Sequence, residues 1–164
     1  MPGPWRLAFL VGALAALPAT CADGPLVPVT VCEVLGNLAM YDGKAVAALG
    51  RYSFRERGRW LSEESCGVDS ATSPAANPTL WLVEDAQNGP RPPDDFEMDG
   101  TVLGHKLADI RKRTTLGKFR FGTPDYDRWA VVYGRVESRK GDGAKIAPAD
   151  LAFRGDGVVV FLNP

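Results

Sequence analysis

Two basic clusters lie far apart in the sequence, and both offer side chains that bind anions. One cluster spans residues 55–59 and has aromatic neighbours, whereas the other spans residues 139–145. Cations beside aromatic rings can hold an anionic group, a sugar ring or the bases of single-stranded nucleic acid. The candidate ligand-binding residues are therefore Tyr52, Arg55, Arg57, Arg59, Trp60, Trp81, Arg139, Lys140 and Lys145.

A purely structural interpretation explains the same residues. Aromatic side chains in strands usually pack into a core, and basic side chains in turns are usually solvated. Net charge also argues against a general nucleic-acid binder, since Lys and Arg number 19 and Asp and Glu number 20. The sequence leaves both the binding and the structural interpretation open.

Cysteine chemistry points to a cross-link. Besides Cys21, the chain has the pair Cys32 and Cys66, with no Cys-x-x-Cys motif between or around them. An even pair in an oxidising compartment favours a disulfide, and the alternative is two buried free thiols. We predict a Cys32–Cys66 disulfide. Only one histidine, His105, is present, so the sequence predicts neither a zinc site nor any other metal site.

No catalytic residue is predicted. His105 falls in an expected helix with no nucleophile beside it in the sequence, and general acid–base catalysis needs positioned partners. Ser62 and Ser65 lack the strand–turn–helix setting of a nucleophile elbow. We expect a protein that is not an enzyme and that uses no cofactor.

Residues 1–22 have the pattern of a secretory signal peptide. Arg6 precedes an apolar run from Leu7 to Leu17, and small residues follow up to Ala22. The run is too short to span a bilayer as a helix. Cleavage after Ala22 would leave residues 23–164 as one periplasmic or secreted domain of net charge −2, because Arg6 is the only charge removed. A lipid anchor on Cys21 is the alternative to free export.

The mature part alternates expected strands and helices. Thr30 and Glu33 have the spacing of a capping box, which predicts a helix from about residue 31 to Ala39. Alternation of apolar and polar residues predicts strands, and helical spacing of Leu103, Leu107 and Ile110 predicts a second helix. The expected strands are Lys44–Arg55, Trp60–Glu63, Thr79–Val83, Arg128–Ser138 and Gly157–Leu162, with the second helix at Val102–Arg113.

This order resembles the oligonucleotide/oligosaccharide-binding (OB) fold, and in particular small exported bacterial proteins of uncharacterised function with OB-like barrels. The resemblance rests on the entry Tyr41–Val46 with Gly50, on Trp60-Leu61 and Leu80-Trp81-Leu82, and on Val131–Val136. It implies a mainly β fold: a five-stranded barrel with an N-terminal helix and a helix between strands three and four.

The same resemblance implies where a ligand would lie. OB folds bind ligands across strands two and three, between the loops that join strands one to two and four to five. Those loops are the two basic clusters, and we expect them to meet at one rim. The leading functional hypothesis is a non-enzymatic binding domain for an envelope protein or a small anionic ligand. The alternatives are an oligosaccharide or single-stranded nucleic-acid binder, and a hydrolase whose site the sequence does not reveal.

Overall fold

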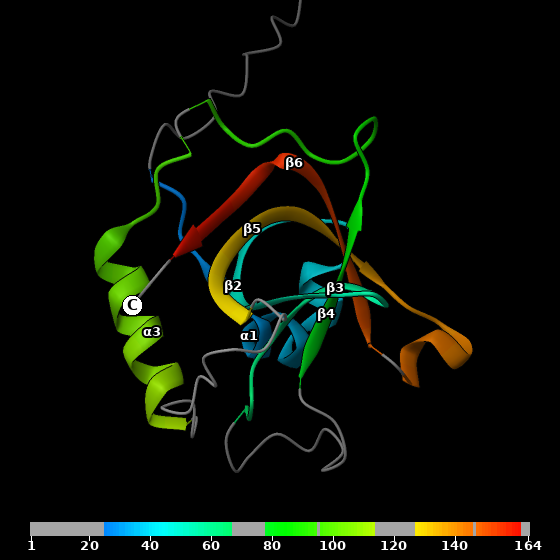
Figure 1. Ribbon diagram of the computed structural model, residues 1–164, viewed down its shortest axis with the longest axis horizontal. Helices are drawn as coiled ribbons and strands as arrows, with labels where there is room; N and C mark the ends of the chain where they lie inside the picture. Colours follow the sequence, from blue (N-terminus) through cyan, green and yellow to red (C-terminus); the bar gives the residue numbers. More distant parts are fainter. Residues whose placement is uncertain (1–24, 67–77, 95, 114–126, 146, 162–164) are drawn as a thin grey trace, which may run out of the picture.

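The computed structural model describes residues 25–66, 78–94, 96–113, 127–145 and 147–161 (Figure 1). The expected signal peptide therefore lies outside the described residues. None of the described helices is long and apolar enough to cross a membrane. In chain order the elements are β1 Val29–Thr30, α1 Val31–Gly36, α2 Leu38–Tyr41, β2 Ala45–Arg55, β3 Gly58–Ser62, β4 Thr79–Glu84, α3 Gly100–Arg113, β5 Asp127–Ser138, the 3-10 helix η1 Gly141–Lys145 and β6 Ala149–Phe161.

Five long strands close into a barrel. Around it the order is β2-β3-β4-β6-β5, and β5 pairs again with β2 from Asp127 to Arg135. The β4–β6 pairing is parallel and the other barrel pairings are antiparallel, so the barrel is mixed. The predicted mainly β, OB-like barrel is confirmed, with an N-terminal helix and a helix between the third and fourth barrel strands.

Helix α1 helps to fill the barrel interior. Its start is stabilised by the predicted capping box: the Glu33 amide donates to the Thr30 hydroxyl at 3.1 Å, and the Thr30 amide donates to the Glu33 carboxylate at 2.7 Å. Val31 and Val34 then lie fully buried in the main core cluster. Gly50 of β2 permits this approach, because a Cβ there would lie 2.8 Å from a Val31 methyl carbon.

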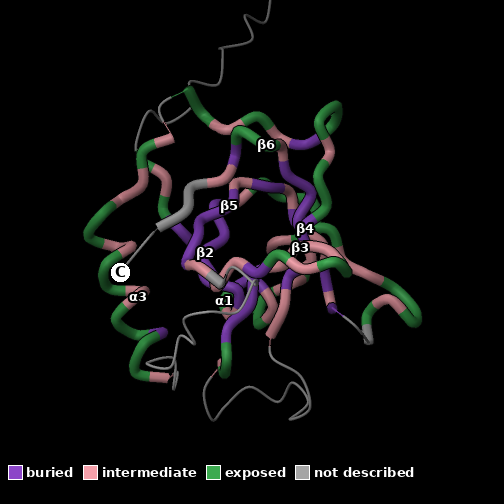
Figure 2. The backbone as a smooth tube through the Cα atoms, in the orientation of Figure 1, coloured by how far each residue is buried: buried purple, intermediate pink, exposed green. Residues whose placement is uncertain are grey.

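Helix α3 packs on the outside of the barrel instead. Buried Ile110 joins a second apolar cluster with Ala47 and Leu49 of β2 and with Trp129 and Val131 of β5. These strand residues alternate with the interior ones, as the period of two in a strand requires. Figure 2 shows α3 as mainly exposed and intermediate, beside strands with long buried stretches. The two helices therefore flank β2 from inside and outside.

Two predicted boundaries differ from the structure by more than two residues. The first helix ends at Gly36 and a short helix α2 restarts after Asn37, whose φ of −130° is not helical. The last strand starts at Ala149 and not at Gly157. Ala149, Leu151 and Phe153 alternate into the core, and the polar residues that follow do not end the strand.

Candidate functional site

A pair of tryptophans lies on the outer face of β3 and β4. Trp60 pairs with Trp81 across the two strands, and Trp81 pairs in turn with Asp150 of β6. The flanking residues Leu61 and Leu80 point into the barrel core, so the tryptophans point outward. Both are only half-buried. We call Trp60, Trp81, Asp150 and the neighbouring Arg139 the tryptophan face.

The two indoles are stacked. Their ring centroids lie 5.5 Å apart with planes 17° from parallel. Gly58, in the turn between β2 and β3, lets the Trp81 ring lie close to the backbone. A Cβ at Gly58 would be 2.5 Å from a Trp81 ring carbon, and its φ of +133° is one that other residues rarely adopt. The position of Trp81 therefore depends on this glycine.

Arg139 completes the face from the connection between β5 and β6. Its amide donates to the Pro148 carbonyl at 2.9 Å, which closes this connection around η1. The guanidinium carbon lies 5.6 Å from the Trp81 ring centroid, and Nε donates to the Asp150 carboxylate at 2.8 Å. The face thus offers aromatic surface together with an ion pair that has both donor and acceptor atoms.

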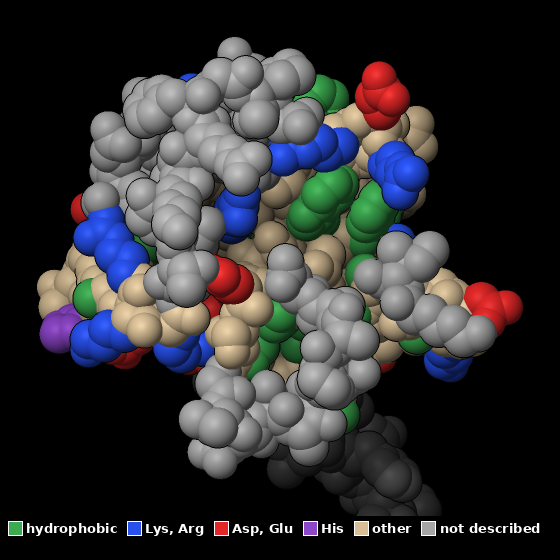
Figure 3. Space-filling model, turned by 60° about the horizontal axis from the view of Figure 1, so that its bottom comes forward, with side chains coloured by type: hydrophobic (Ala, Val, Ile, Leu, Met, Phe, Trp, Pro, Cys, Tyr) green, Lys and Arg blue, Asp and Glu red, His purple; other side chains and the backbone are tan. Residues whose placement is uncertain are grey.

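The structure brings together three predicted site residues, Trp60, Trp81 and Arg139. Gly58 and Arg139 both contact Trp81, so the β2–β3 turn and the start of the β5–β6 connection border one ring. Hydrophobic side chains also reach the surface beside Lys and Arg side chains in the space-filling view (Figure 3).

Other predicted residues lie elsewhere. Tyr52 pairs with Leu61 and packs against the barrel interior. This position agrees with the purely structural interpretation, in which strand aromatics pack into the core. Arg59 lies on the opposite side of the hairpin from Trp60, where its guanidinium is 5.2 Å from the Phe54 ring and 3.1 Å from Glu84. Exposed Phe54 is the cross-strand partner of Arg59, so both side chains lie on the side of the hairpin opposite Trp60.

Four basic residues remain. Arg55 is half-buried and donates to the Phe54 carbonyl at 3.0 Å. Arg57 and Lys140 are exposed. The side chain of Lys145 lies outside the described residues, although its backbone belongs to η1.

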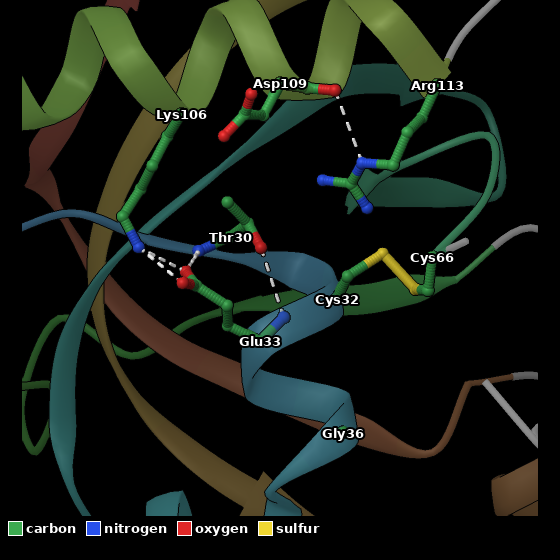
Figure 4. Close-up of a pocket in the computed structure, with 8 residues that line it drawn as sticks. All are labelled: Thr30, Cys32, Glu33, Gly36, Cys66, Lys106, Asp109 and Arg113. Carbon is green, nitrogen blue, oxygen red and sulfur yellow. Dashed lines mark hydrogen bonds and ion pairs between the residues drawn. A yellow bond between two sulfur atoms is a disulfide. The ribbon is translucent and has the colours of Figure 1, made fainter. Parts of the chain in front are cut away.

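A second feature, absent from the sequence-based prediction, is a cleft of about 400 Å³ between α1 and α3. We call it the α1–α3 cleft (Figure 4). Its lining residues are Thr30, Cys32, Glu33, Gly36, Cys66, Lys106, Asp109 and Arg113.

One wall of the cleft is an ion pair that ties α3 to α1. The Lys106 ammonium lies 2.6 Å from Glu33 Oε1. Partial burial would raise the pKa of Glu33, but hydrogen bonds from Lys106 and from the Thr30 amide hold that pKa below its ordinary value of 4.5. Glu33 thus stays charged while it caps α1.

Behind the cleft lies a buried carboxylate that contacts two of the lining residues, Cys32 and Arg113. The Glu63 side chain is fully buried; Oε1 accepts from the Cys32 amide at 2.8 Å, and Oε2 lies 3.5 Å from a terminal nitrogen of Arg113. Oε2 accepts no hydrogen bond from any described residue. Burial is the main cause that raises the pKa of Glu63 above 4.5.

The predicted disulfide is confirmed. Cys32 of α1 and Cys66, which follows β3, are bonded with Cα atoms 5.3 Å apart. Such a bond is compatible with an oxidising compartment. Sequence spacing could not reveal its neighbours, because Lys106 and Arg113 meet Glu33 and Glu63 only through the fold.

His105 is exposed on α3 and does not line the cleft. Among the residues that the structure describes, no group of three or more His, Cys, Asp or Glu residues could hold a metal ion. The chain matches no protein-family model, no curated protein and no solved structure.

Proposed function

We propose that this chain is a non-enzymatic binding domain of the cell envelope and that its ligand, a protein segment or a small molecule with an anionic group, contacts the tryptophan face. One observation carries the proposal. Trp60 and Trp81 are stacked and half-exposed on the outside of the barrel, with Arg139 beside them, although the barrel has a complete apolar core without them.

Residue type supports a recognition role. Tryptophan and arginine are the residues most enriched among the few that dominate the energy of protein interfaces. Val83, two residues after Trp81 and on the same side of β4, is 41% exposed and extends the apolar surface. A ligand that covered Trp60, Trp81 and Val83 would remove apolar area from water.

Charge pairing limits the kind of ligand. Arg139, the cation of the tryptophan face, is paired with Asp150. Paired cations release few counterions when a polyanion binds, so this surface lacks the electrostatic driving force of a nucleic-acid groove. An isolated anionic group can still share Arg139 with Asp150.

An oligosaccharide is the second candidate, and the same ion pair favours it. Sugar hydroxyls both donate and accept hydrogen bonds, and the Arg139–Asp150 pair offers donors and acceptors at the edge of two aromatic rings. A hydrolase has less support, because the cleft and the tryptophan face do not include His105.

Site-specific photo-crosslinking tests the lead proposal. A photoreactive phenylalanine analogue at Val83 would sit on the tryptophan face, whereas the same analogue at Phe54 would sit on the opposite side of the β2–β3 hairpin. We expect crosslinked products in native envelopes from Val83 and not from Phe54, and we expect Trp81→Ala to remove them. Equal products from both positions, or products that survive Trp81→Ala, would contradict the proposal.

Equilibrium binding of defined probes separates the candidates. The probes are a neutral chitotetraose, a sulfated heparin tetrasaccharide and a ten-residue oligothymidine. Trp60→Ala should weaken binding of either sugar at least tenfold, while the matched control Phe54→Ala should leave it unchanged. Tight binding of oligothymidine with a steep salt dependence would instead favour the nucleic-acid alternative.

A further inference from the structure

We infer that the Cys32–Cys66 disulfide is a thiol-exchange site: a dithiol reaches it in the folded protein through the α1–α3 cleft and reduces it reversibly. The site is separate from the tryptophan face. Three observations carry the inference: the access to the sulfur atoms, the bonds that hold the two cysteines without the disulfide, and the cations that line the cleft.

Access comes from the position of the disulfide. Both cysteines line the cleft, and both are half-buried, not sealed in the core. Figure 4 shows the sulfur–sulfur bond beside the start of α1, with the Arg113 side chain pointing from α3 into the space next to it. A small dithiol therefore has a route to the bond that does not require the barrel to open.

The backbone at Cys32 and the backbone beside Cys66 are also held in place by noncovalent bonds. On one side, the Cys32 amide donates to buried Glu63 at 2.8 Å. On the other, Arg113 donates to the carbonyl of Ser65, the residue before Cys66, at 3.4 Å and lies 3.5 Å from Glu63. Glu63 and Arg113 thus connect the backbone of one cysteine to the backbone beside the other. Breaking the sulfur–sulfur bond leaves this connection in place.

Helix α1 does not depend on the disulfide for its position. Val31 and Val34 are buried in the barrel core, the capping box fixes the first turn, and Glu33 is paired with Lys106 of α3. The reduced protein should therefore keep its fold, and its two thiols should stay close enough to re-form the bond.

The chemistry is ordinary thiol–disulfide exchange. A thiolate of the dithiol attacks one of the two sulfur atoms, forms a mixed disulfide and releases the other cysteine as a thiolate. The second thiol of the reagent then displaces the remaining cysteine and leaves as a cyclic or protein disulfide. Two electrons pass from the dithiol to the pair, and each released thiolate takes one proton from solvent.

Arg113 favours this exchange. A cation beside a cysteine lowers the pKa of its thiol and makes it a better leaving group. Of the other charged groups that line the cleft, Glu33 and Lys106 offset each other, and the charge of Asp109 is offset by Lys112 from outside the cleft. Arg113 contacts buried Glu63, so its charge is partly offset as well, but its donors also face the cleft.

Reduction kinetics of the oxidised full chain test the inference, with Cys21→Ser included so that only the two thiols of this pair are counted. The chain is treated with dithiothreitol, alkylated at intervals and weighed by mass spectrometry. If the bond is reached in the folded state, the rate rises linearly with dithiothreitol and is insensitive to low denaturant. The reduced chain should keep its far-ultraviolet dichroism and should re-oxidise fully.

Variants of α3 sharpen the test. Arg113→Ala should slow reduction roughly threefold, the effect of raising the leaving-thiol pKa by about one unit. Arg111→Ala is the matched control, since Arg111 is exposed on the same helix and is not among the residues that line the cleft, and it should leave the rate unchanged. A rate that levels off with dithiothreitol and climbs with denaturant would overturn the inference, as would loss of the fold on reduction, because either result makes the bond a structural cross-link alone.

Discussion

The tryptophan face and the α1–α3 cleft are built in different ways. The face joins residues that are direct neighbours across β3, β4 and β6, with Trp60, Trp81 and Asp150 in one row. The cleft joins residues from separate elements, and its Glu33–Lys106 pair spans 73 residues of sequence. One region is aromatic and needs no contact from α1 or α3, whereas the other exists only because α3 packs close enough to α1 for Lys106 to reach Glu33.

That difference separates binding from stability. Changes on the outer face should alter ligand contacts and leave the core intact, because Trp60 and Trp81 belong to neither apolar cluster. Changes at the cleft should alter the attachment of α1 and leave the tryptophans unaffected. The following predictions test whether the two regions are independent.

The largest effect should come from the cleft. Replacing both cysteines by serine removes a cross-link between residues 34 apart, and we expect the free energy of unfolding to fall by about 2–4 kcal/mol. Urea denaturation measures the loss. Binding of the sugar probes should stay as in the unmodified chain, and a parallel loss of binding would show that the two regions are coupled.

Gly58→Ala should give the next largest effect, this time on the face. The new methyl group would collide with the Trp81 ring, and φ is +133°, so we expect a loss of about 1–3 kcal/mol. Tryptophan fluorescence should change at the same time, because Trp81 must move. Gly104→Ala is the control, since the space around Gly104 is open and the helix should tolerate alanine.

Arg139→Ala should affect stability less. Its cation–π contact with Trp81 and its ion pair with Asp150 are both partly solvent-exposed, so together we expect a loss of at most about 1 kcal/mol. Probe binding should fall much more than stability does. Lys140→Ala, an exposed neighbouring cation, provides the comparison, and an equal loss of binding there would mean that only the summed charge of the loop matters.

Two glutamates of the cleft region should respond to pH with opposite signs. Because the pKa of Glu63 is raised by burial, the stability that Glu63 contributes is present below pH 4.5 and is lost as the pH rises through its folded-state pKa. Glu33 has a lowered pKa, so its contribution is present above pH 4.5 and is lost as the pH falls through that pKa.

Glutamine variants separate the two contributions. Glu63→Gln should flatten the decline in melting temperature above pH 4.5, and Glu33→Gln should flatten the decline below it. Thermal melts across this range provide the measurement. If both variants change the same side of the pH curve, the assignment of the two environments is incorrect.

Sequence patterns predicted most strands and helices because their signals are local, whereas the barrel was implied by the resemblance of their order to the OB fold. Alternation along β2 and β5, the Thr30–Glu33 capping box and the apolar run of β4 each act within a few residues. Composition predicted the disulfide, because Cys32 and Cys66 form an even pair in a chain that is expected to enter an oxidising compartment. The wrong start of β6 came from Arg154-Gly155-Asp156, which has the composition of a turn. These residues lie at an irregularity inside β6, because β5 pairs with Phe153 before them and with Val158 after them.

The candidate sites were less predictable for a physical reason. Trp60, Trp81 and Arg139 were identified by residue type, but the side of the sheet that each occupies follows from strand register, which separates Tyr52 and Arg59 from them. The cleft depends on how α1 and α3 pack, and no local pattern encodes the approach of Arg113 to Glu63.

Indole resonances offer the most direct test of the tryptophan face. In a chain labelled with ¹⁵N-tryptophan, Trp129 is a built-in control, because its side chain is 3% exposed and lies in the cluster beneath α3. The chain is titrated with chitotetraose and, separately, with the heparin tetrasaccharide. We predict that the indole N–H signals of Trp60 and Trp81 shift together and saturate with at least one probe, while that of Trp129 stays in place. Unmoved Trp60 and Trp81 signals with both probes, or an equal shift of Trp129, would contradict the binding of a sugar or a small anionic ligand at the tryptophan face.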